Sequence, residues 1–277
     1  MAGFEVRAAT ERDGPRMAEL DRLAFGTAGM GHYGESHFRC WREVNPEGLL
    51  VASQGGAAIA CCYSQYVDFS PEDVSLLTTD AAFTDSALTR KTHRPAGNAI
   101  HVVTVSSIVP GGRRALFEAL LRQLVAQNRA YLILFSRVSG LRRYCEMLTA
   151  RGVDVASLGL QRVAPWYVAQ CAALFEDARV WARVKREPLA LPPPAVPDPV
   201  LNKYLKDRGA EVAAVLVDWI EDPASCNCSA LVAIRNPRCA GELIRQRTEP
   251  DASGSYGGDV GTAGDEANRY EPAQQQR

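Results

Sequence analysis

Apolar residues recur along the chain with two different spacings, and each spacing predicts a different element. Short apolar runs bounded by Gly, Pro or Asn predict strands. They occupy residues 5–8, 48–69 (a hairpin about Gln54-Gly55-Gly56), 99–109, 131–136, 211–220 and 229–236. Apolar residues three and four positions apart predict helices. They occupy residues 10–24, 37–44, 112–128, 140–151, 163–187 and 201–210.

The order of these elements constrains how the strands pair. A strand, a helix and a second strand follow one another at residues 99–109, 112–128 and 131–136. This order predicts a right-handed parallel crossover. The last two strands, 211–220 and 229–236, are close in sequence and predict an antiparallel pair. Parallel and antiparallel strands are therefore expected in one chain.

Three segments interrupt the regular pattern. Residues 70–97 are polar and predict a long excursion that holds one short helix. Residues 191–199, LPPPAVPDP, form a proline-rich linker. Residues 241–277 contain few apolar side chains and are expected to be disordered, because such a segment cannot bury enough apolar surface to fold.

Composition and charge exclude several classes of protein. The 277 residues are 47% apolar, enough for one large domain or two small ones. The net charge is −1, so no strong field favours nucleic acid or an anionic membrane. No run approaches the roughly 18 apolar residues of a membrane span. The chain is therefore expected to bind neither nucleic acid nor membrane.

The eight cysteines are expected to be reduced thiols in a cytoplasmic protein. The N-terminal stretch MAGFEVRAATERD is charged and lacks the apolar core of a signal peptide. Cys226-Asn-Cys228 is too closely spaced for a usual zinc pair. A second clear pair or a nearby His is lacking, so no metal is expected.

The turn after the 99–109 strand carries an unusual set of residues, TVSSIVPGGRRALFEALLRQL from Thr104 to Leu124. Two glycines and two arginines directly precede an amphipathic helix. Backbone N–H groups at a helix start can receive an anion, and arginines can reach its oxygens. The alternative is a plain connection with solvated arginines, and the residues alone leave both open.

The element order and two motifs resemble the GNAT fold of acyl-CoA-dependent N-acyltransferases. The motifs are the opening VRAATERDGPRMAELDRLAFG and the loop Val109-Pro110-Gly111-Gly112-Arg113. The resemblance implies a central mixed, mostly antiparallel sheet with splayed central strands, flanked by helices. It also implies that acetyl-CoA or another acyl-CoA is a cosubstrate. The implied cofactor-binding residues are Val109, Gly111, Gly112, Arg113, Arg114 and Ala115.

The same loop departs from the family pattern. Leu116 and Glu118 stand at its two later glycine positions. Side chains there are expected to crowd the CoA pyrophosphate, and the Glu118 carboxylate is expected to repel it.

A closer resemblance is to GNAT-like domains of polyketide-synthase loading modules, of the curacin and saxitoxin type. It rests on SRVSGLRRY at 136–144 and DPVLNKYLKDRGAEVAAVLVDWIEDPAS at 198–225. Ser136, Leu205 and Ile220 match the positions of the Thr, His and Arg that surround the malonyl group in decarboxylating members. Leu205 and Ile220 can neither hydrogen-bond nor neutralise a carboxylate, which argues against malonyl decarboxylation.

Four residues are candidates for catalysis. His101 is the only titratable group on its strand with a suitable unperturbed pKa. It is expected to face away from Thr104 and Ser106, because side chains alternate along a strand. Ser136 keeps the hydroxyl of the family's Thr. Tyr144 and Tyr204 are candidates for the acid that protonates the thiolate. For His101, Tyr144 and Tyr204, a purely structural role is the alternative.

These observations predict one GNAT-like acyltransferase domain over residues 1–240, with insertions at about 70–97 and 155–190. Its donor is expected to be acyl-CoA or a phosphopantetheine thioester. Its acceptor is a small molecule or a carrier protein. The alternative is a catalytically degenerate module that binds CoA or a carrier protein without turnover.

Overall fold

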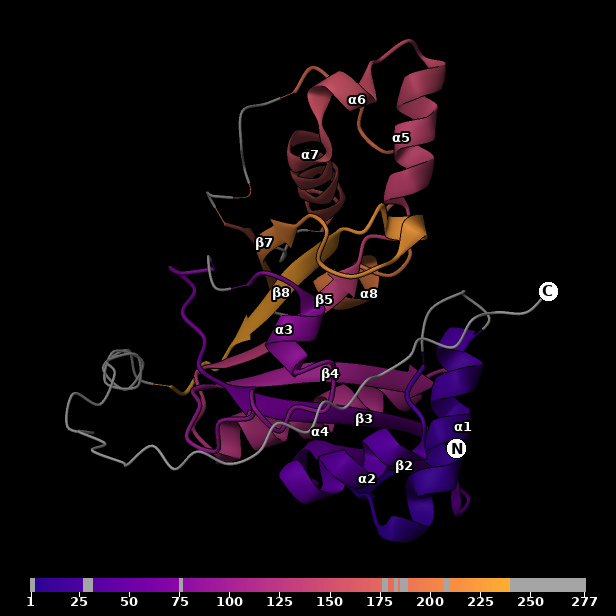
Figure 1. Ribbon diagram of the computed structural model, residues 1–277, viewed down its shortest axis with the longest axis vertical. Helices are drawn as coiled ribbons and strands as arrows, with labels where there is room; N and C mark the ends of the chain where they lie inside the picture. Colours follow the sequence, from indigo (N-terminus) through magenta and orange to yellow (C-terminus); the bar gives the residue numbers. More distant parts are fainter. Residues whose placement is uncertain are drawn as a thin grey trace, which may run out of the picture.

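An eight-stranded sheet with strand order β1-β2-β3-β4-β5-β8-β7-β6 runs through the molecule, with helices on both faces (Figure 1). The computed structural model describes residues 3–26, 32–74, 77–175, 179–181, 184, 189–206 and 210–239. The strands are β1 Glu5–Ala8, β2 Leu49–Gln54, β3 Ala57–Val67, β4 Ala99–Ser107, β5 Tyr131–Arg137, β6 Arg179–Val180, β7 Ala210–Leu216 and β8 Ser229–Arg235. The helices are α1 Gly14–Phe25, α2 Glu35–Val44, α3 Asp80–Thr84, α4 Gly112–Ala126, α5 Leu141–Ala150, α6 Val155–Leu158, α7 Leu160–Ala172 and α8 Asn202–Leu205.

The predicted pairings are confirmed. β2 and β3 form the expected hairpin, and β7 pairs with β8 antiparallel. β4 and β5 are parallel and are connected through α4, as the crossover requires. The remaining parallel pair is β6 with β7, so the sheet is mixed and mostly antiparallel.

Helix boundaries differ from the sequence prediction in three places. The helix expected at 163–187 is α7, which begins at Leu160 because Gly159, at φ +76°, separates it from α6. α2 begins at Glu35, two residues before the predicted start, with Gly34 as its N-cap. The helix expected at 201–210 is the short α8. Residues 207–209, the 241–277 tail and most of 176–188 lie outside the described residues.

Three apolar clusters divide the core between the two faces of the sheet. The largest joins the sheet to α4, α5 and α7. A second lies under α1 and α2 and includes the fully buried Trp41 stacked on Tyr63 at 4.4 Å. A third lies under the 70–97 excursion. Burial of these side chains supplies the main driving force for folding.

β4 and β5 pair over only part of their length. The paired residues are Ala99–Val102 and Tyr131–Leu134, whereas β4 continues to Ser107 and β5 to Arg137. The central strands therefore diverge beyond Val102 and Leu134, as the splayed sheet of the GNAT resemblance requires.

A β-bulge at Val103 changes the phase of β4. Ser64 of β3 pairs with Val102, but Tyr63 pairs with Thr104, so Val103 has no partner on β3. A bulge re-aims the side chains beyond it. Thr104 and Ser106 consequently turn toward α1, on the face where His101 meets α3. The prediction that they face away from His101 is wrong for this reason.

The 70–97 excursion is tied to the sheet at several points and contains the expected short helix, α3. The Asn98 side chain hydrogen-bonds both Phe69 N and Phe69 O at 2.8 Å, which closes the excursion at its base. Gln65 Nε2 donates to Phe83 O at 3.2 Å. α3 is thereby held over the start of β4.

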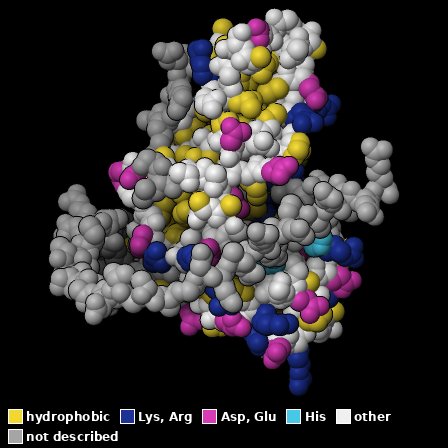
Figure 2. All heavy atoms as spheres, in the orientation of Figure 1, with side chains coloured by type: hydrophobic (Ala, Val, Ile, Leu, Met, Phe, Trp, Pro, Cys, Tyr) yellow, Lys and Arg dark blue, Asp and Glu magenta, His cyan; other side chains and the backbone are white. Residues whose placement is uncertain are grey.

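The surface shows no dominant charge on the face drawn in Figure 2. Positive and negative side chains are interspersed there, mostly around α1 and α2, while hydrophobic side chains gather over the region of α7 and of strands β7 and β8. All eight cysteines lie in the described part of the chain and are free thiols. None of the described helices is long and apolar enough to cross a membrane.

Candidate active site

A cavity of about 780 Å³ opens where β4 and β5 diverge. Its walls come from β4 and the following turn, from the end of β5, from α8 and from Trp219-Ile220. Val102 and Leu134 face the cluster under α4, whereas His101 and Phe135 contact Phe83 of α3 on the other face. The cavity therefore reaches both faces of the sheet through the gap between the strands.

The cavity brings together six of the ten residues expected from the sequence. They are His101, Ser136, Tyr204, Val109, Gly111 and Arg113. Gly112, Arg114, Ala115 and Tyr144 do not line it. The Tyr144 hydroxyl instead donates to Pro192 O at 2.7 Å and accepts from Trp166 at 3.2 Å, so it connects α5, α7 and the proline-rich linker.

The two glycines of the turn meet steric requirements. Gly111 has φ +93°, and a Cβ on it would lie 2.7 Å from the ring of Phe4. A Cβ on Gly112 would lie 2.7 Å from Ser107 Oγ. The N–H groups of Gly112 and Ala115 donate to Val109 O and Gly111 O, so both are engaged within the turn. An anion at this turn must rely on other groups.

Leu116 and Glu118 do not crowd the cavity, contrary to expectation. Leu116 is fully buried in the core. The Glu118 carboxylate accepts from Arg114 at 2.9 Å on the exposed side of α4. The Leu116 and Glu118 side chains thus lie away from the cavity, whereas Phe117 between them lines it together with Arg113.

Arg113 spans the mouth of the cavity from α4 to α8. Its guanidinium carbon lies 5.5 Å from the Phe117 ring centre and 5.3 Å from that of Tyr204. Nη2 donates to Lys203 O at 3.2 Å. The Lys203 side chain also lines the cavity. Two cationic residues, Arg113 and Lys203, therefore lie at the mouth of the cavity.

His101 is neutral at physiological pH. Its ring is completely buried, and burial lowers the pKa to about 3. Gln65 Oε1 already accepts from Thr92 at 2.8 Å, so Gln65 Nε2 is the donor to His101 Nδ1 at 3.1 Å. This arrangement leaves the ring proton on Nε2. His101 is consequently suited to donate a hydrogen bond rather than to act as a base.

Asp80 lines the cavity as well, and sequence reasoning missed it. Burial raises the pKa of its carboxyl group to about 6. Within the described part of the chain, no hydrogen bond or ion pair holds this carboxylate. Its sequence context gives no signal, because Asp80 is one of several acids in a polar excursion. Only the tertiary anchoring of α3 brings it to the cavity.

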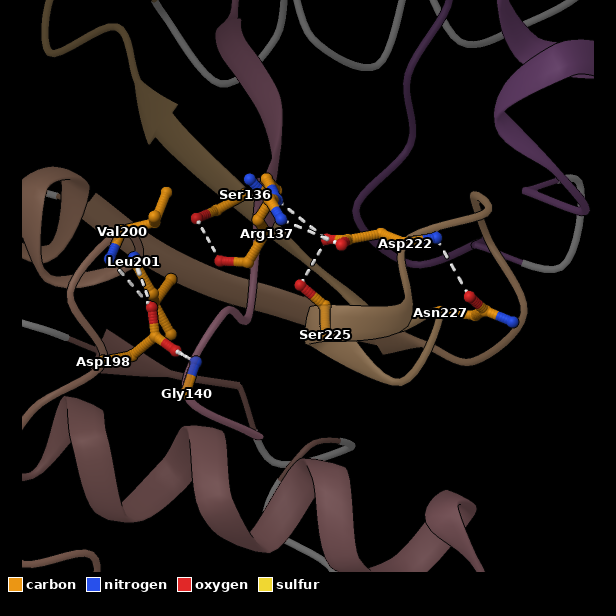
Figure 3. Close-up of polar contacts among 9 residues, drawn as sticks. All are labelled: Ser136, Arg137, Gly140, Asp198, Val200, Leu201, Asp222, Ser225 and Asn227. Atoms are coloured by element: carbon orange, nitrogen blue, oxygen red, sulfur yellow. Dashed lines mark hydrogen bonds and ion pairs between the residues drawn. The ribbon is translucent and has the colours of Figure 1, made fainter. Parts of the chain in front are cut away.

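The motif residues beside the cavity hold its walls in place (Figure 3). Arg137 of β5 makes two hydrogen bonds to Asp222, at 2.7 and 2.8 Å. Burial acts to raise the pKa of the nearly inaccessible Asp222 carboxyl, but the hydrogen bonds from Arg137 and Ser225 outweigh it and lower that pKa. Ser136 Oγ donates to the carbonyl of Arg137 at 3.0 Å.

Asp198 joins α8 to the turn after β5 (Figure 3). One carboxylate oxygen accepts from the backbone N–H groups of Val200 and Leu201, at 2.9 and 2.8 Å. The other accepts from Gly140 N at 2.7 Å. The Asp-Pro-x-Leu motif therefore positions α8, and with it Tyr204, against the cavity.

Leu205 stands at the position matched to the motif's histidine. Leu205 is buried in the core, whereas the adjacent Tyr204 lines the cavity. Ile220, at the motif's arginine position, does line the cavity. Among the described residues, no cluster of three His, Cys, Asp or Glu side chains is suited to a metal.

Comparison with solved structures identifies the fold. The GphF GNAT-like decarboxylase, in complex with isobutyryl-CoA, is 15% identical with a TM-score of 0.58 and covers 84% of this chain and 99% of its own. The loading GNATL domain of CurA from Lyngbya majuscula is 14% identical with a TM-score of 0.55, over 88% and 100%. No family model matches the chain, and no curated protein matches it in sequence. The chain has the GNAT fold, and its structural neighbours are GNAT-like domains.

Proposed function

We propose that the cavity binds an acyl thioester of CoA or of a phosphopantetheine arm and that the protein transfers the acyl group to an acceptor. The observation that carries this proposal is the gap between β4 and β5, which opens directly into the cavity. A strand edge that is not paired with its neighbour presents backbone N–H and C=O groups to a ligand. An extended chain with amide groups, such as pantetheine, can pair with both edges.

The positive charges at the mouth of the cavity fit the phosphate groups of such a ligand. Arg113 and Lys203 both line the cavity where α4 begins. Arginine binds phosphate oxygens through paired N–H groups, and lysine adds a point charge. The pyrophosphate of CoA, or the phosphate of a carrier-protein arm, would lie here, with the thioester directed inward.

The inner residues suit acyl transfer. The His101 Nε2–H group can donate to the thioester carbonyl as negative charge develops on its oxygen. Tyr204 supplies a hydroxyl for the departing sulfur, and Ser136 a second polar group on the wall of β5. Malonyl decarboxylation is not proposed, because Ile220 offers no cation and Arg137 is engaged with Asp222.

Arg113→Ala is expected to weaken acetyl-CoA binding about tenfold, since a charge-assisted hydrogen bond is worth roughly 1.5–3 kcal/mol and part of it is screened here. Arg114→Ala is the matched control. Arg114 is the next residue but pairs with Glu118 on the exposed side of α4. Its loss should leave the affinity unchanged. Isothermal titration of the three proteins with acetyl-CoA measures both effects.

Equal losses in the two variants would mean that the arginines act only through overall charge. No binding of acetyl-CoA to the unchanged protein would remove CoA as the donor. A phosphopantetheinylated carrier protein would then be titrated under the same conditions. Absence of binding there as well would refute the proposal.

A binding module without turnover is the second candidate. The low basicity of His101 and the apolar Ile220 in the cavity favour it. Release of free CoA thiol from acetyl-CoA in the presence of acceptor amines separates the two, because a binding module holds the thioester without consuming it.

A further inference from the structure

Two half-buried thiols meet outside the cavity. Cys145 lies on α5, and Cys226 lies on the loop that connects β7 to β8. α5 packs against the 3-10 turn Pro223–Ser225, which ends directly before Cys226 (Figure 1). The Cys145 thiol donates a hydrogen bond to the Cys226 sulfur. The two sulfur atoms are therefore in near contact, although the residues are far apart in the chain.

The other cysteines are not placed to form such a pair. Neighbouring cysteines on β3 point to opposite faces of the sheet, because side chains alternate along a strand. Cys228 is fully buried and donates to Cys226 O at 3.3 Å. Cys239 packs in the cluster under the 70–97 excursion, which contains no second cysteine among the described residues. The remaining cysteines are buried, and they are Cys40, Cys61, Cys62 and Cys171.

The turn that carries Cys226 is held by hydrogen bonds on both sides. Asn227 N donates to Asp222 O at 2.9 Å, and the Asn227 side chain accepts from Asp222 N at 2.9 Å (Figure 3). Cys226 N donates to Pro223 O at 3.2 Å. Cys226 and Asn227 are both left-handed, at φ +50° and +58°. Because these bonds fix an otherwise unfavourable backbone conformation, the Cys226 side chain is presented to α5 in one orientation.

The same loop forms part of the cavity wall. Trp219 N donates to Asn227 O at 3.0 Å, next to Cys226. Trp219 and Ile220 line the cavity. Asp222 of this loop accepts two hydrogen bonds from Arg137 of β5. A covalent bond from Cys226 to α5 therefore restrains a wall of the cavity from outside.

We propose that Cys145 and Cys226 form a reversible disulfide that fastens the β7–β8 loop to α5 when the protein is oxidised. The structure shows the reduced form of this pair. A disulfide needs two sulfur atoms about 2.05 Å apart, so it forms between thiols that are already in near contact. The inference goes beyond the proposed function and does not depend on it, because neither cysteine lines the cavity.

The exchange balances with a small-molecule disulfide as the oxidant, such as oxidised glutathione. Cys226 loses its proton and attacks one sulfur of the oxidant, and one thiolate leaves. Cys145 then loses its proton and attacks the Cys226 sulfur of the mixed disulfide, and the second thiolate leaves. The two departing thiolates take up the two protons. Two protein thiols are thus oxidised, and one disulfide is reduced to two thiols.

The surroundings assign the first attack to Cys226. Burial raises the pKa of both thiols, that of Cys145 to about 12. The charge of Arg142 and the hydrogen bond from Cys145 act to lower the Cys226 pKa. The carboxylates of Glu146 and Asp222 act to raise it. Cys226 therefore loses its proton before Cys145, and the exchange is run at pH 8.5, where the thiolate fraction is larger.

The test oxidises the full-length protein and three variants, Cys145→Ser, Cys226→Ser and the control Cys239→Ser. Each protein is incubated in glutathione buffers of increasing redox potential, alkylated, and digested with trypsin without reduction. Mass spectrometry detects the linked peptides 144–151 and 209–235, and fragment ions distinguish Cys226 from Cys228. Thermal unfolding and hydrogen–deuterium exchange are measured on the oxidised and the reduced proteins.

The unchanged protein and Cys239→Ser are expected to form the Cys145–Cys226 bond and to lose it on reduction with dithiothreitol. Because the bond closes a long loop of the unfolded chain, oxidation is expected to raise their midpoint of thermal unfolding by about 5 °C or more. It is also expected to slow exchange in residues 217–228. Neither effect is expected in Cys145→Ser or Cys226→Ser. Absence of the bond at the most oxidising potential, a bond to Cys228 instead, or unchanged exchange in residues 217–228 would overturn the inference.

Discussion

Replacing Asp198 with Ala is expected to lower the free energy of unfolding by about 3–5 kcal/mol. Asp198 is fully buried and accepts three backbone N–H groups, those of Gly140, Val200 and Leu201. Each buried donor left without an acceptor costs about 1–3 kcal/mol, and local relaxation recovers part of the sum. The loss would also free α8 from the turn after β5, so Tyr204 would leave its place beside Arg113.

Asp154→Ala is the control for this measurement. Asp154 also accepts a backbone N–H, from Ser157 at 3.0 Å, but it lies exposed at the start of α6. Its loss is expected to cost clearly less than the loss of Asp198, as for an exposed helix cap. Urea denaturation gives both values. If Asp198→Ala lowers the free energy of unfolding no more than Asp154→Ala does, the motif does not hold α8 in place.

Asp80→Asn is expected to raise stability at pH 7 on the order of 1–2 kcal/mol, the opposite of most substitutions. The folded-state pKa of about 6 lies above the ordinary 3.8, because burial disfavours the charged form. One pKa unit corresponds to about 1.4 kcal/mol. Because the Asp80 carboxyl is partly exposed, solvent screening makes the stability cost smaller than the full pKa shift would give. A side chain that costs stability and has no partner within the described residues suggests a function that retains it.

The raised pKa of Asp80 also predicts how the stability of the wild type changes with pH. The folded protein binds the Asp80 proton more tightly than the unfolded chain, so the wild type gains stability as pH falls through about 6. The gain is complete below about pH 4, where both states are protonated. The difference between Asp80→Asn and wild type should therefore be largest at pH 7 and vanish near pH 4. A difference that is constant with pH would contradict a raised pKa at Asp80.

Sequence patterns predicted most of the fold because those signals are local. The strand-helix-strand order around α4 predicted the parallel β4–β5 pair, and Gln54-Gly55-Gly56 predicted the β2–β3 hairpin. Each of these depends on neighbours in the chain.

The features that shape the site depend on contacts across the sheet. The bulge at Val103 reflects the register of β3 against β4 and reverses the facing expected for Thr104 and Ser106. Asp80 reaches the cavity only because Gln65 and Trp219 hold α3. Neither feature leaves a pattern in the sequence.

In the Gly-Gly-Arg-Arg turn, the two glycines are required by packing, whereas the two arginines have different surroundings. Gly111 and Gly112 allow α4 to begin against Phe4 and Ser107, where a Cβ would clash. Arg114 is an exposed ion-pair partner of Glu118. Arg113 alone of the four is a charged side chain that lines the cavity. Among the side chains of the turn, Arg113 is therefore the one placed to contact an anion in the cavity.

The central claim is that the gap between β4 and β5 receives the thioester arm, and hydrogen–deuterium exchange with and without acetyl-CoA tests it most directly. Saturating acetyl-CoA is expected to slow backbone exchange in residues 103–115 and 135–137, where ligand amides would pair with the open strand edges. Residues 49–54 of β2, which pair with β1 and β3, should not change. Unchanged exchange at the gap, or protection confined to another part of the chain, would contradict the account.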